Sequence, residues 1–140
     1  MFVSRKGGAE VLILRRSALQ GGYWHVVAGG VETGETATAA AERELSEETG
    51  LVATVEAGVE VVEYVDPRTK EPAAQPPKRE ASVAQVNVTC FHVTAPDDWE
   101  PTLDWEHDDH RWCDPGEAHT AIRWPATADA LRKLLMLDSN

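Results

Sequence analysis

Apolar and polar residues alternate in several short segments of the chain, and such alternation predicts β-strands with one buried and one exposed face. The predicted strands cover residues 10–16, 23–27, 52–65, 82–94 and 105–113. The first of them, EVLILRR, is rich in branched apolar residues and ends at two arginines. The third, VATVEAGVEVVEYV, is long enough for either one strand or a hairpin.

Two further segments predict α-helices. Thr36 is a residue type that caps helix N-termini and Gly50 is one that ends helices, so a helix is expected between them. Apolar residues at helical spacing predict a second helix over residues 126–137, and residues 114–117 predict a turn or a short helix start. The order of strands, helix, strands and helix favours an α/β fold, in which helices sandwich a mixed sheet.

Proline-rich segments separate these elements. Residues 66–81 contain four prolines and residues 95–104 contain two, so both segments predict irregular loops. The first loop is long for a connection within a compact domain, which favours a mobile or a functional segment. The sequence leaves its role open.

The chain length of 140 residues predicts a single domain, over residues 1–140, with enough buried core to fold without disulfides. Cys90 and Cys113 have no partner at metal-ligand spacing, and the sequence favours two buried thiols over a disulfide between them. No apolar run reaches the length of a membrane span, and the N-terminus does not resemble a signal peptide. We therefore expect a cytoplasmic protein without a membrane partner.

The net charge of −11 argues against a nucleic acid polymer as partner, because such binding requires a basic surface. A small phosphorylated substrate is still compatible with this charge, provided that bound cations neutralise the encounter. The segment that suits such cations is residues 29–51, GGVETGETATAAAERELSEETGL. No Gly-Lys-Ser/Thr follows its two glycines, so a Walker-type phosphate loop is excluded.

The predicted helix in this segment carries carboxylates on one side. At about 100° per residue, Glu44 and Glu48 lie one turn apart, with Glu47 on the flank. Like charges four residues apart destabilise a helix by about 0.2–0.5 kcal/mol, and carboxylates in the last turn also face the negative end of the helix dipole. Bound Mg²⁺ relieves both costs, because it accepts several carboxylate oxygens and keeps waters for a phosphate. The alternative is a solvated acidic face, which this spacing disfavours.

The same residues resemble the signature of the Nudix hydrolase family, G-x5-E-x7-R-E-U-x-E-E-x-G-U, in which U is apolar. Every fixed position of the signature is filled, by Gly29, Glu35, Arg43, Glu44, Leu45, Glu47, Glu48, Gly50 and Leu51. The resemblance implies the α/β/α sandwich of that family with its mixed sheet, and Mg²⁺ or Mn²⁺ as cofactor. Ala28 is a departure, since many members have proline there, and the usual N-terminal strand would be shortened.

Residue roles follow from the resemblance by position. It implies metal ligands from the helix and from the loop before it: Glu44, Glu48, Glu47 and the backbone carbonyl of Gly29 or its neighbour Ala28. Arg43 is implied as a catalytic residue that orients a helix carboxylate, and Glu35 as a partner behind it. The physical chemistry is consistent with these roles, because metal ions polarise bridging phosphates and activate a bound water.

A second segment, EHDDHRW at residues 106–112, resembles the E-H-x4-W stretch of dihydroneopterin triphosphate and dATP pyrophosphatases, and diadenosine tetraphosphate hydrolases carry a similar one. The resemblance implies Glu106 as a further metal ligand or general base, and an exposed strand-end carboxylate is the alternative. Whether Glu47 or Glu106 is the base stays open. His107 and His110 invite a zinc interpretation, but on a regular strand they point to opposite faces. Trp112 is favoured as a core residue over a base-stacking one.

Four residues before the helix are candidates for substrate contacts. Arg15 and Arg16 follow the first predicted strand, and either a phosphate contact or a solvated pair fits them. Tyr23 and Trp24 suit stacking on a base or simple packing equally well.

The predicted function is Mg²⁺-dependent hydrolysis of a phosphoanhydride bond in a nucleoside triphosphate or a similar nucleoside diphosphate derivative. The loop VETGE at residues 31–35 resembles the triphosphate pyrophosphatases, whereas tetraphosphate hydrolases usually carry Pro-Lys-Gly in that loop. The alternatives are a dinucleoside polyphosphate hydrolase and a Nudix-like module that senses a nucleotide without cleaving it. The base, the leaving group and the choice between a monomer and a homodimer stay open.

Overall fold

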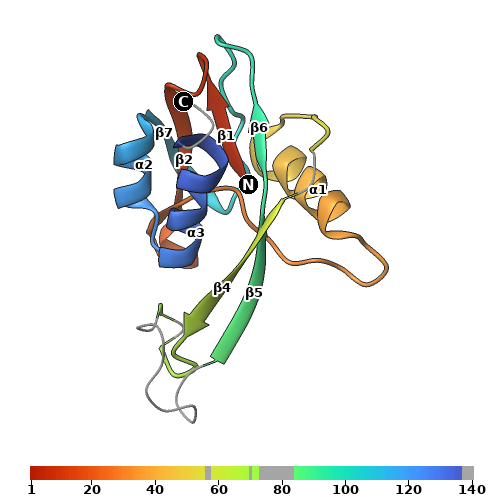
Figure 1. Ribbon diagram of the computed structural model, residues 1–140, viewed down its shortest axis with the longest axis vertical. Helices are drawn as coiled ribbons and strands as arrows, with labels where there is room; N and C mark the ends of the chain where they lie inside the picture. Colours follow the sequence, from red (N-terminus) through yellow and green to blue (C-terminus); the bar gives the residue numbers. More distant parts are fainter. Residues whose placement is uncertain (56–57, 70, 73–83, 137–140) are drawn as a thin grey trace.

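The computed structural model describes residues 1–55, 58–69, 71–72 and 84–136 (Figure 1). Its larger sheet contains β1 (Phe2–Arg5), β2 (Glu10–Arg16), β3 (Trp24–His25), β6 (His92–Thr94) and β7 (His107–Cys113). β2 pairs with β7 along one edge. Along its other edge it pairs with β1 near its start and with β3 near its end. β1 and β6 are parallel and the other pairs are antiparallel, so the sheet is mixed, as predicted.

Helices cover both faces of this sheet (Figure 1). The helices and helical turns are α1 (Ala37–Thr49), α2 (Pro115–Ala121), α3 (Pro125–Leu131), a 3₁₀ turn at Ala18–Gln20 and a final π turn at Arg132–Met136. Alternate residues of β2 point to the two sides: Leu12 packs in the cluster of Leu45 from α1, whereas Ile13 packs in the cluster of Leu131 from α3. The result is the predicted α/β/α sandwich.

A smaller sheet lies beside this sandwich. β4 (Val59–Val65) pairs antiparallel with β5 (Ala84–Cys90), and the two strands extend away from the larger sheet (Figure 1). Glu63 of β4 is buried and accepts the backbone N–H groups of Ala126 and Thr127, over 3.1 and 2.6 Å. Because these N–H groups lie at the start of α3, where helical donors lack partners, Glu63 both caps α3 and attaches the smaller sheet to it.

The local signals around α1 were sufficient to predict it. Thr36 caps the helix by accepting the N–H of Ala39 over 3.0 Å, and Gly50 ends it in a left-handed conformation at φ 82°. Two other predictions also hold: residues 95–104 contain no helix or strand, and Cys90 and Cys113 are buried free thiols.

The strand predicted over residues 52–65 is wrong in its first half, because β4 begins only at Val59. The N–H of Val55 donates to the side chain of Glu42 on α1, over 2.9 Å, so this segment follows the helix instead of pairing with a strand. Positions 56 and 57 lie outside the described residues.

The strand predicted over residues 82–94 is divided at Phe91 into β5 and β6, which belong to different sheets. Phe91 marks the change of partner, since its carbonyl accepts the N–H of Phe2 over 2.7 Å. β1 itself was not predicted, because four residues are too few to show a reliable alternation. Positions 82 and 83 lie outside the described residues.

The remaining predicted bounds differ by a few residues. β7 starts at His107 instead of residue 105, and the C-terminal helix starts at Pro125 and changes to the π turn at Arg132. In the loop predicted over residues 66–81, a turn covers residues 67–69 and Pro72 forms an isolated bridge with Val65; residues 70 and 73–81 lie outside the described residues. Among the helices of the described part of the chain, none has the length and apolarity that crossing a membrane requires.

Candidate metal and substrate site

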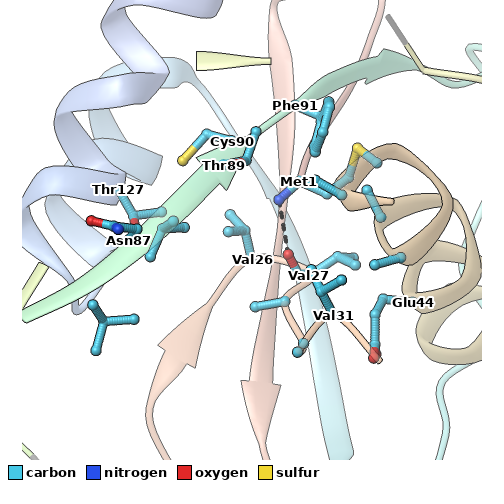
Figure 2. Close-up of a pocket in the computed structure, with 18 of the residues that line it drawn as sticks. Met1, Val26, Val27, Val31, Glu44, Asn87, Thr89, Cys90, Phe91 and Thr127 are labelled. Carbon is cyan, nitrogen blue, oxygen red and sulfur yellow. Dashed lines mark hydrogen bonds between the residues drawn. The ribbon is translucent and has the colours of Figure 1, made fainter. Parts of the chain in front are cut away.

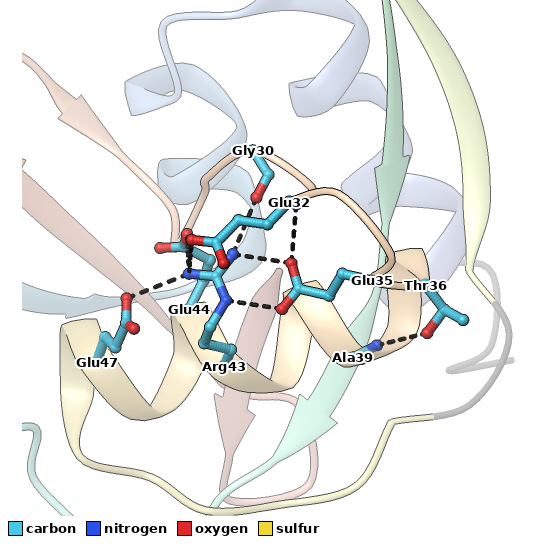
Figure 3. A network of polar contacts seen from close by, with 8 residues as sticks. All are labelled: Gly30, Glu32, Glu35, Thr36, Ala39, Arg43, Glu44 and Glu47. Atoms are coloured by element: carbon cyan, nitrogen blue, oxygen red, sulfur yellow. Dashed lines mark hydrogen bonds and ion pairs between the residues drawn. The ribbon is translucent and has the colours of Figure 1, made fainter.

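Arg43 of α1 lies at the centre of a network of carboxylates (Figure 3). Its Nε and Nη2 donate to the two carboxylate oxygens of Glu35, over 2.7 and 3.0 Å. Its Nη1 donates to Glu44 over 2.8 Å and to Glu47 over 3.3 Å. Nη2 also donates to the backbone carbonyl of Gly30, over 3.0 Å. The guanidinium therefore connects the loop before α1 to the carboxylates of the helix.

Glu35 holds the shape of that loop. Its Oε1 accepts the backbone N–H of Glu32 over 2.9 Å, in addition to its two bonds from Arg43. The hydrogen bonds from Arg43, followed by that from the Glu32 backbone, lower the pKa of Glu35 to about 2. The carboxylate is therefore ionised at neutral pH, and its two parallel bonds to the guanidinium fix the geometry of the pair.

Glu48 is the buried member of the helix carboxylates: its side chain is 3% exposed, whereas that of Glu47 is 57% exposed. It lies on the same side of α1 as the buried Leu45. Burial and then the neighbouring carboxyl of Glu44 raise the pKa of Glu48 to about 9. Oε1 of Glu48 is buried without a hydrogen-bond partner among the described residues, a condition that costs about 1–3 kcal/mol in a folded protein.

Gly29 lies directly against the carboxyl group of Glu44. A Cβ atom at position 29 would overlap that carboxyl group, whereas a Cβ at Gly30 would meet no atom within 4 Å. A side chain at position 29 would therefore displace the Glu44 carboxyl from its present place, whereas one at position 30 would not.

His107, which the sequence reasoning did not select as a site residue, contacts Glu48. Its side chain is 2% exposed, and its Nε2 lies 3.6 Å from Oε1 of Glu48. Its Nδ1 lies 2.8 Å from Oδ1 of Asp104, in the turn before β7. The E-H-x4-W stretch contains His107, but that resemblance pointed to its neighbour Glu106.

The expectation that His107 and His110 point to opposite faces of a strand is wrong. On β2, Leu14 lies opposite His110, and Arg16, two residues further on, lies opposite His107. The three-residue step on β7 therefore contains one extra residue, a β-bulge, which places both histidines on the face of α1. They have different carboxylate partners, since Nε2 of His110 lies 3.3 Å from Glu100. Within the described residues, the pair is not part of any cluster of three potential metal ligands.

A cavity of about 280 Å³ opens beside α1 (Figure 2). Its walls come from residues 25–31, from the first half of α1 and from residues 86–91, with Met1 and Thr127 completing it. Figure 2 shows Glu44 at the opposite end of the cavity from Asn87 and Thr127. Asn87 and Thr127 were not predicted as site residues, because β5 and α3 are far from α1 in the sequence.

His25 also lines the cavity and is buried. Burial is the largest cause that lowers its pKa to about 3, and the positive charges of the N-terminus and Arg16 act in the same direction. The imidazole is therefore neutral at pH 7. Its Nδ1 has no hydrogen-bond partner among the described residues.

Glu106 lies beside Arg16, whose Nη2 is 3.6 Å from Oε2 of Glu106. The N–H of Ser17 donates to the backbone carbonyl of Glu106 over 2.8 Å, which anchors this end of β7 to β2. In the part of the chain that the structure describes, no hydrogen bond or ion pair connects Glu106 to the carboxylates of α1. A role for Glu106 as metal ligand or base is still a prediction.

Arg15 and Trp24 lie on the face of the sheet opposite α1. Nε of Arg15 donates to Asp108 over 2.7 Å, and its guanidinium lies 5.8 Å from the centre of the Trp24 ring. Trp24 packs against the core cluster beneath α2 and α3. Of the alternatives left open by the sequence, the geometry favours packing for Trp24 and an ion pair for Arg15.

Tyr23 and Trp112 also contact other side chains of the protein. The ring of Tyr23 lies 4.9 Å from the guanidinium of Arg123. Nε1 of Trp112 donates to Glu100 over 2.7 Å, and the ring packs against the core on the α1 side, in agreement with the core interpretation. The four predicted substrate-contacting residues do not line the cavity: Arg15, Arg16, Tyr23 and Trp24. Their contacts with a substrate stay predictions.

The residues around Glu48 fit a hard divalent cation. The nearby donors are carboxylate and backbone oxygens, which Mg²⁺ prefers, and Oε1 of Glu48 is a buried oxygen that lacks a partner. Gly29 leaves room for the carboxyl of Glu44 beside its backbone. Among the described residues no three His, Cys, Asp or Glu side chains already form a closed metal cluster. A cation held by Glu44 and Glu48 would share the Glu44 carboxylate with Arg43.

Comparison with known proteins identifies the family. The model of the NUDIX domain family matches residues 1–134, which is nearly the whole chain. The chain therefore belongs to the Nudix hydrolase family, as the signature in α1 and the α/β/α sandwich had indicated.

Solved structures share the fold. The E. coli dihydroneopterin triphosphate pyrophosphohydrolase superposes with a TM-score of 0.78 at 22% identity, over 97% of this chain and 92% of that one. A C. elegans Ap4A hydrolase in a binary complex superposes with a TM-score of 0.74 at 21% identity, over 99% and 93% of the two chains. At these identities the likeness concerns the fold.

A curated relative from Myxococcus xanthus, named octanoyltransferase, is 36% identical over 106 residues. The match covers 76% of this chain but 27% of that protein, so this chain corresponds to about a quarter of its relative's length.

Proposed function

We propose that this chain hydrolyses a phosphoanhydride bond in a nucleoside triphosphate, or in a similar nucleoside diphosphate derivative, with Mg²⁺ or Mn²⁺ as cofactor. The observation that carries the proposal is the position of Glu44. It lines one end of the cavity and is also the carboxylate that Arg43 holds, next to Glu48. A nucleotide in the cavity would therefore have its phosphates beside the residues that fit a cation.

The cavity suits the heterocyclic base of such a substrate. Apolar side chains such as Val27, Val31 and Phe91 form much of its wall, and Asn87 and Thr127 supply hydrogen-bonding groups at the end far from Glu44. Ligand cavities of this type are mostly apolar with a few polar groups that fix orientation. The name of the *E. coli* pyrophosphohydrolase with the same fold supports a triphosphate as the first substrate to test.

Residue roles in the proposed reaction follow from the contacts. The bound cation would polarise the phosphoryl oxygens and lower the pKa of a bound water. The groups proposed to hold it are Glu44, Glu48, Glu47 and the backbone carbonyl of Gly29 or Ala28. Arg43, itself fixed by Glu35, orients Glu44 toward the site.

Two carboxylates are candidates for the base that takes a proton from the attacking water. Glu47 is 57% exposed and shares Arg43 with other carboxylates, so its side chain is free to reach solvent. Glu106 is 34% exposed and pairs with Arg16. A small nucleotide as partner is also consistent with the cytoplasmic location expected from the sequence.

The test is a panel of nucleotides, assayed with Mg²⁺ and with Mn²⁺, in which all products are identified. Wild-type protein should release pyrophosphate or phosphate from a triphosphate, and Glu48→Gln should reduce turnover by several orders of magnitude. Glu42→Gln is the matched control, because it makes the same change on the same helix at a variable position of the signature. Near-wild-type turnover of Glu48→Gln would contradict the proposal.

The product pattern also decides between the proposed function and its alternatives. Cleavage of a dinucleoside tetraphosphate in preference to all triphosphates would indicate the dinucleoside polyphosphate hydrolase. Tight binding of a nucleotide that is recovered intact would indicate a sensor.

A further inference from the structure

The carboxyl group of Glu48 has neighbours on α1, in the loop before it and on β7. It lies beside the carboxyl of Glu44, a proposed cation ligand, and beside the backbone N–H of Ala28, in the loop that carries the proposed carbonyl ligands. Its Oε1 is buried and has no hydrogen-bond partner among the described residues. The group that faces this oxygen is the ring of His107, with Nε2 at 3.6 Å.

Asp104 fixes the orientation of the His107 ring. Nδ1 lies 2.8 Å from Oδ1 of the Asp104 side chain, and the hydrogen bond between them holds the ring plane. The backbone N–H of His107 also donates to the carbonyl of Asp104, over 3.3 Å, which closes the turn before β7. The β-bulge in β7 brings the ring to the face of α1, where its side chain is 2% exposed.

We propose that His107, held by Asp104, is a positioning residue that sets the orientation of the Glu48 carboxyl group at the cation site. The proposal rests on the proposed function, since it concerns the same site. A buried carboxyl on a helix has several rotamers, and only those that direct its free oxygens toward Glu44 and the loop of Ala28 suit a shared cation. The His107 ring lies 3.6 Å from Oε1, so it would obstruct rotamers that carry the carboxyl further toward β7. Partners behind metal ligands typically change metal affinity by about 10–100-fold when they are removed.

Two substitutions test the two nitrogen positions of the His107 ring separately. In His107→Gln, the side-chain amide reaches the former position of Nε2, so the group that faces Glu48 is retained. In His107→Asn, the amide ends at the former position of Nδ1, so the group that faces Asp104 is retained and the contact with Glu48 is lost. His110→Gln is the matched control, because His110 lies on the same strand and the same face but contacts Glu100.

The measurement is the dissociation constant of Mg²⁺ alone, by calorimetry, and of Mn²⁺ alone, by the electron paramagnetic resonance of the free ion. We expect His107→Asn to weaken metal binding about tenfold or more, His107→Gln by less than about threefold, and His110→Gln not at all. In turnover assays His107→Asn should lower kcat at fixed metal concentration and leave KM for the nucleotide nearly unchanged. Thermal unfolding of each metal-free variant shows that it is folded. If His107→Asn does not fold, Asp104→Ala, which frees the ring, should show the same weakening.

Each outcome has a distinct meaning. Folded His107→Asn with the metal affinity of the wild type, or equal weakening in the Gln and Asn variants, overturns the positioning role and leaves the proposed function intact. Wild-type protein that binds metal in a His107-dependent way but hydrolyses no nucleotide supports the positioning role and contradicts the proposed function. Wild-type protein that binds neither metal, with or without nucleotide, overturns both.

Discussion

Glu48→Gln should change how the stability of the metal-free protein depends on pH. The pKa of Glu48 is raised to about 9 in the folded state, mainly by burial, so the folded protein keeps a proton that the unfolded chain has released above the ordinary carboxyl range. The free energy of unfolding therefore falls as pH rises between these two values, by about 1.4 kcal/mol per pH unit. From pH 5.5 to pH 7.5 this amounts to about 3 kcal/mol. Gln imitates the neutral acid and has no proton to lose, so the variant should lack this loss.

The assay is urea denaturation in the presence of EDTA at pH 5.5, 6.5 and 7.5, with the wild type and the variant compared at each pH. His25 contributes with the opposite sign, since its lowered pKa makes the protein less stable as pH falls below about 6.5, but this contribution is the same in both proteins and cancels. Glu47→Gln, which makes the same change at an exposed position of the same helix turn, is the control. Parallel pH profiles for the wild type and Glu48→Gln would refute the argument that burial keeps Glu48 protonated.

Gly29→Ala should weaken Mg²⁺ binding at least about tenfold, because the added methyl group would overlap the Glu44 carboxyl; calorimetry with Gly30→Ala, which should bind normally, tests this. Glu63→Ala should lower the free energy of unfolding by about 2–4 kcal/mol, because two N–H groups at the start of α3 lose their acceptor, and a loss below about 1 kcal/mol in urea denaturation would contradict the capping role. Arg43→Lys should lower turnover at least about tenfold with the positive charge retained, since one ammonium cannot replace a two-pronged donor; unchanged kinetics would show that charge alone is sufficient.

The parts of the fold that depend on neighbouring residues could be predicted from the sequence. α1 lies between the N-cap and the glycine stop that predicted it, and β2 has the bounds expected from EVLILRR. The wrong strand predictions concern segments whose structure depends on contacts with residues far away in the sequence. The segment before β4 alternates like a strand, but the bond from Val55 to Glu42 holds it along α1. The change of sheet at Phe91 is set by pairing with Phe2, which no local pattern records.

The candidate site also contains residues that the sequence could select and residues that it could not. Contacts among Arg43, Glu35 and Glu44 join positions within one short segment, so a signature in the sequence was enough to select these residues. His107 reaches Glu48 only because of the bulge in β7, and regular strand geometry gave the wrong face for it. The cavity walls from residues 86–91 come from a strand whose neighbour across the cavity is about sixty residues earlier in the chain, and sequence spacing does not indicate such a contact.

The extra residue in β7 makes the length of this strand as significant as its composition. Deleting one of the two residues between His107 and His110 would remove the bulge and leave a regular two-residue step, so both rings would stay on the face of α1. A relative without the extra residue should carry the two corresponding side chains two positions apart instead of three. Alignments of this region should therefore be judged by where they place gaps, because one gap exchanges the inner and outer residues of the strand.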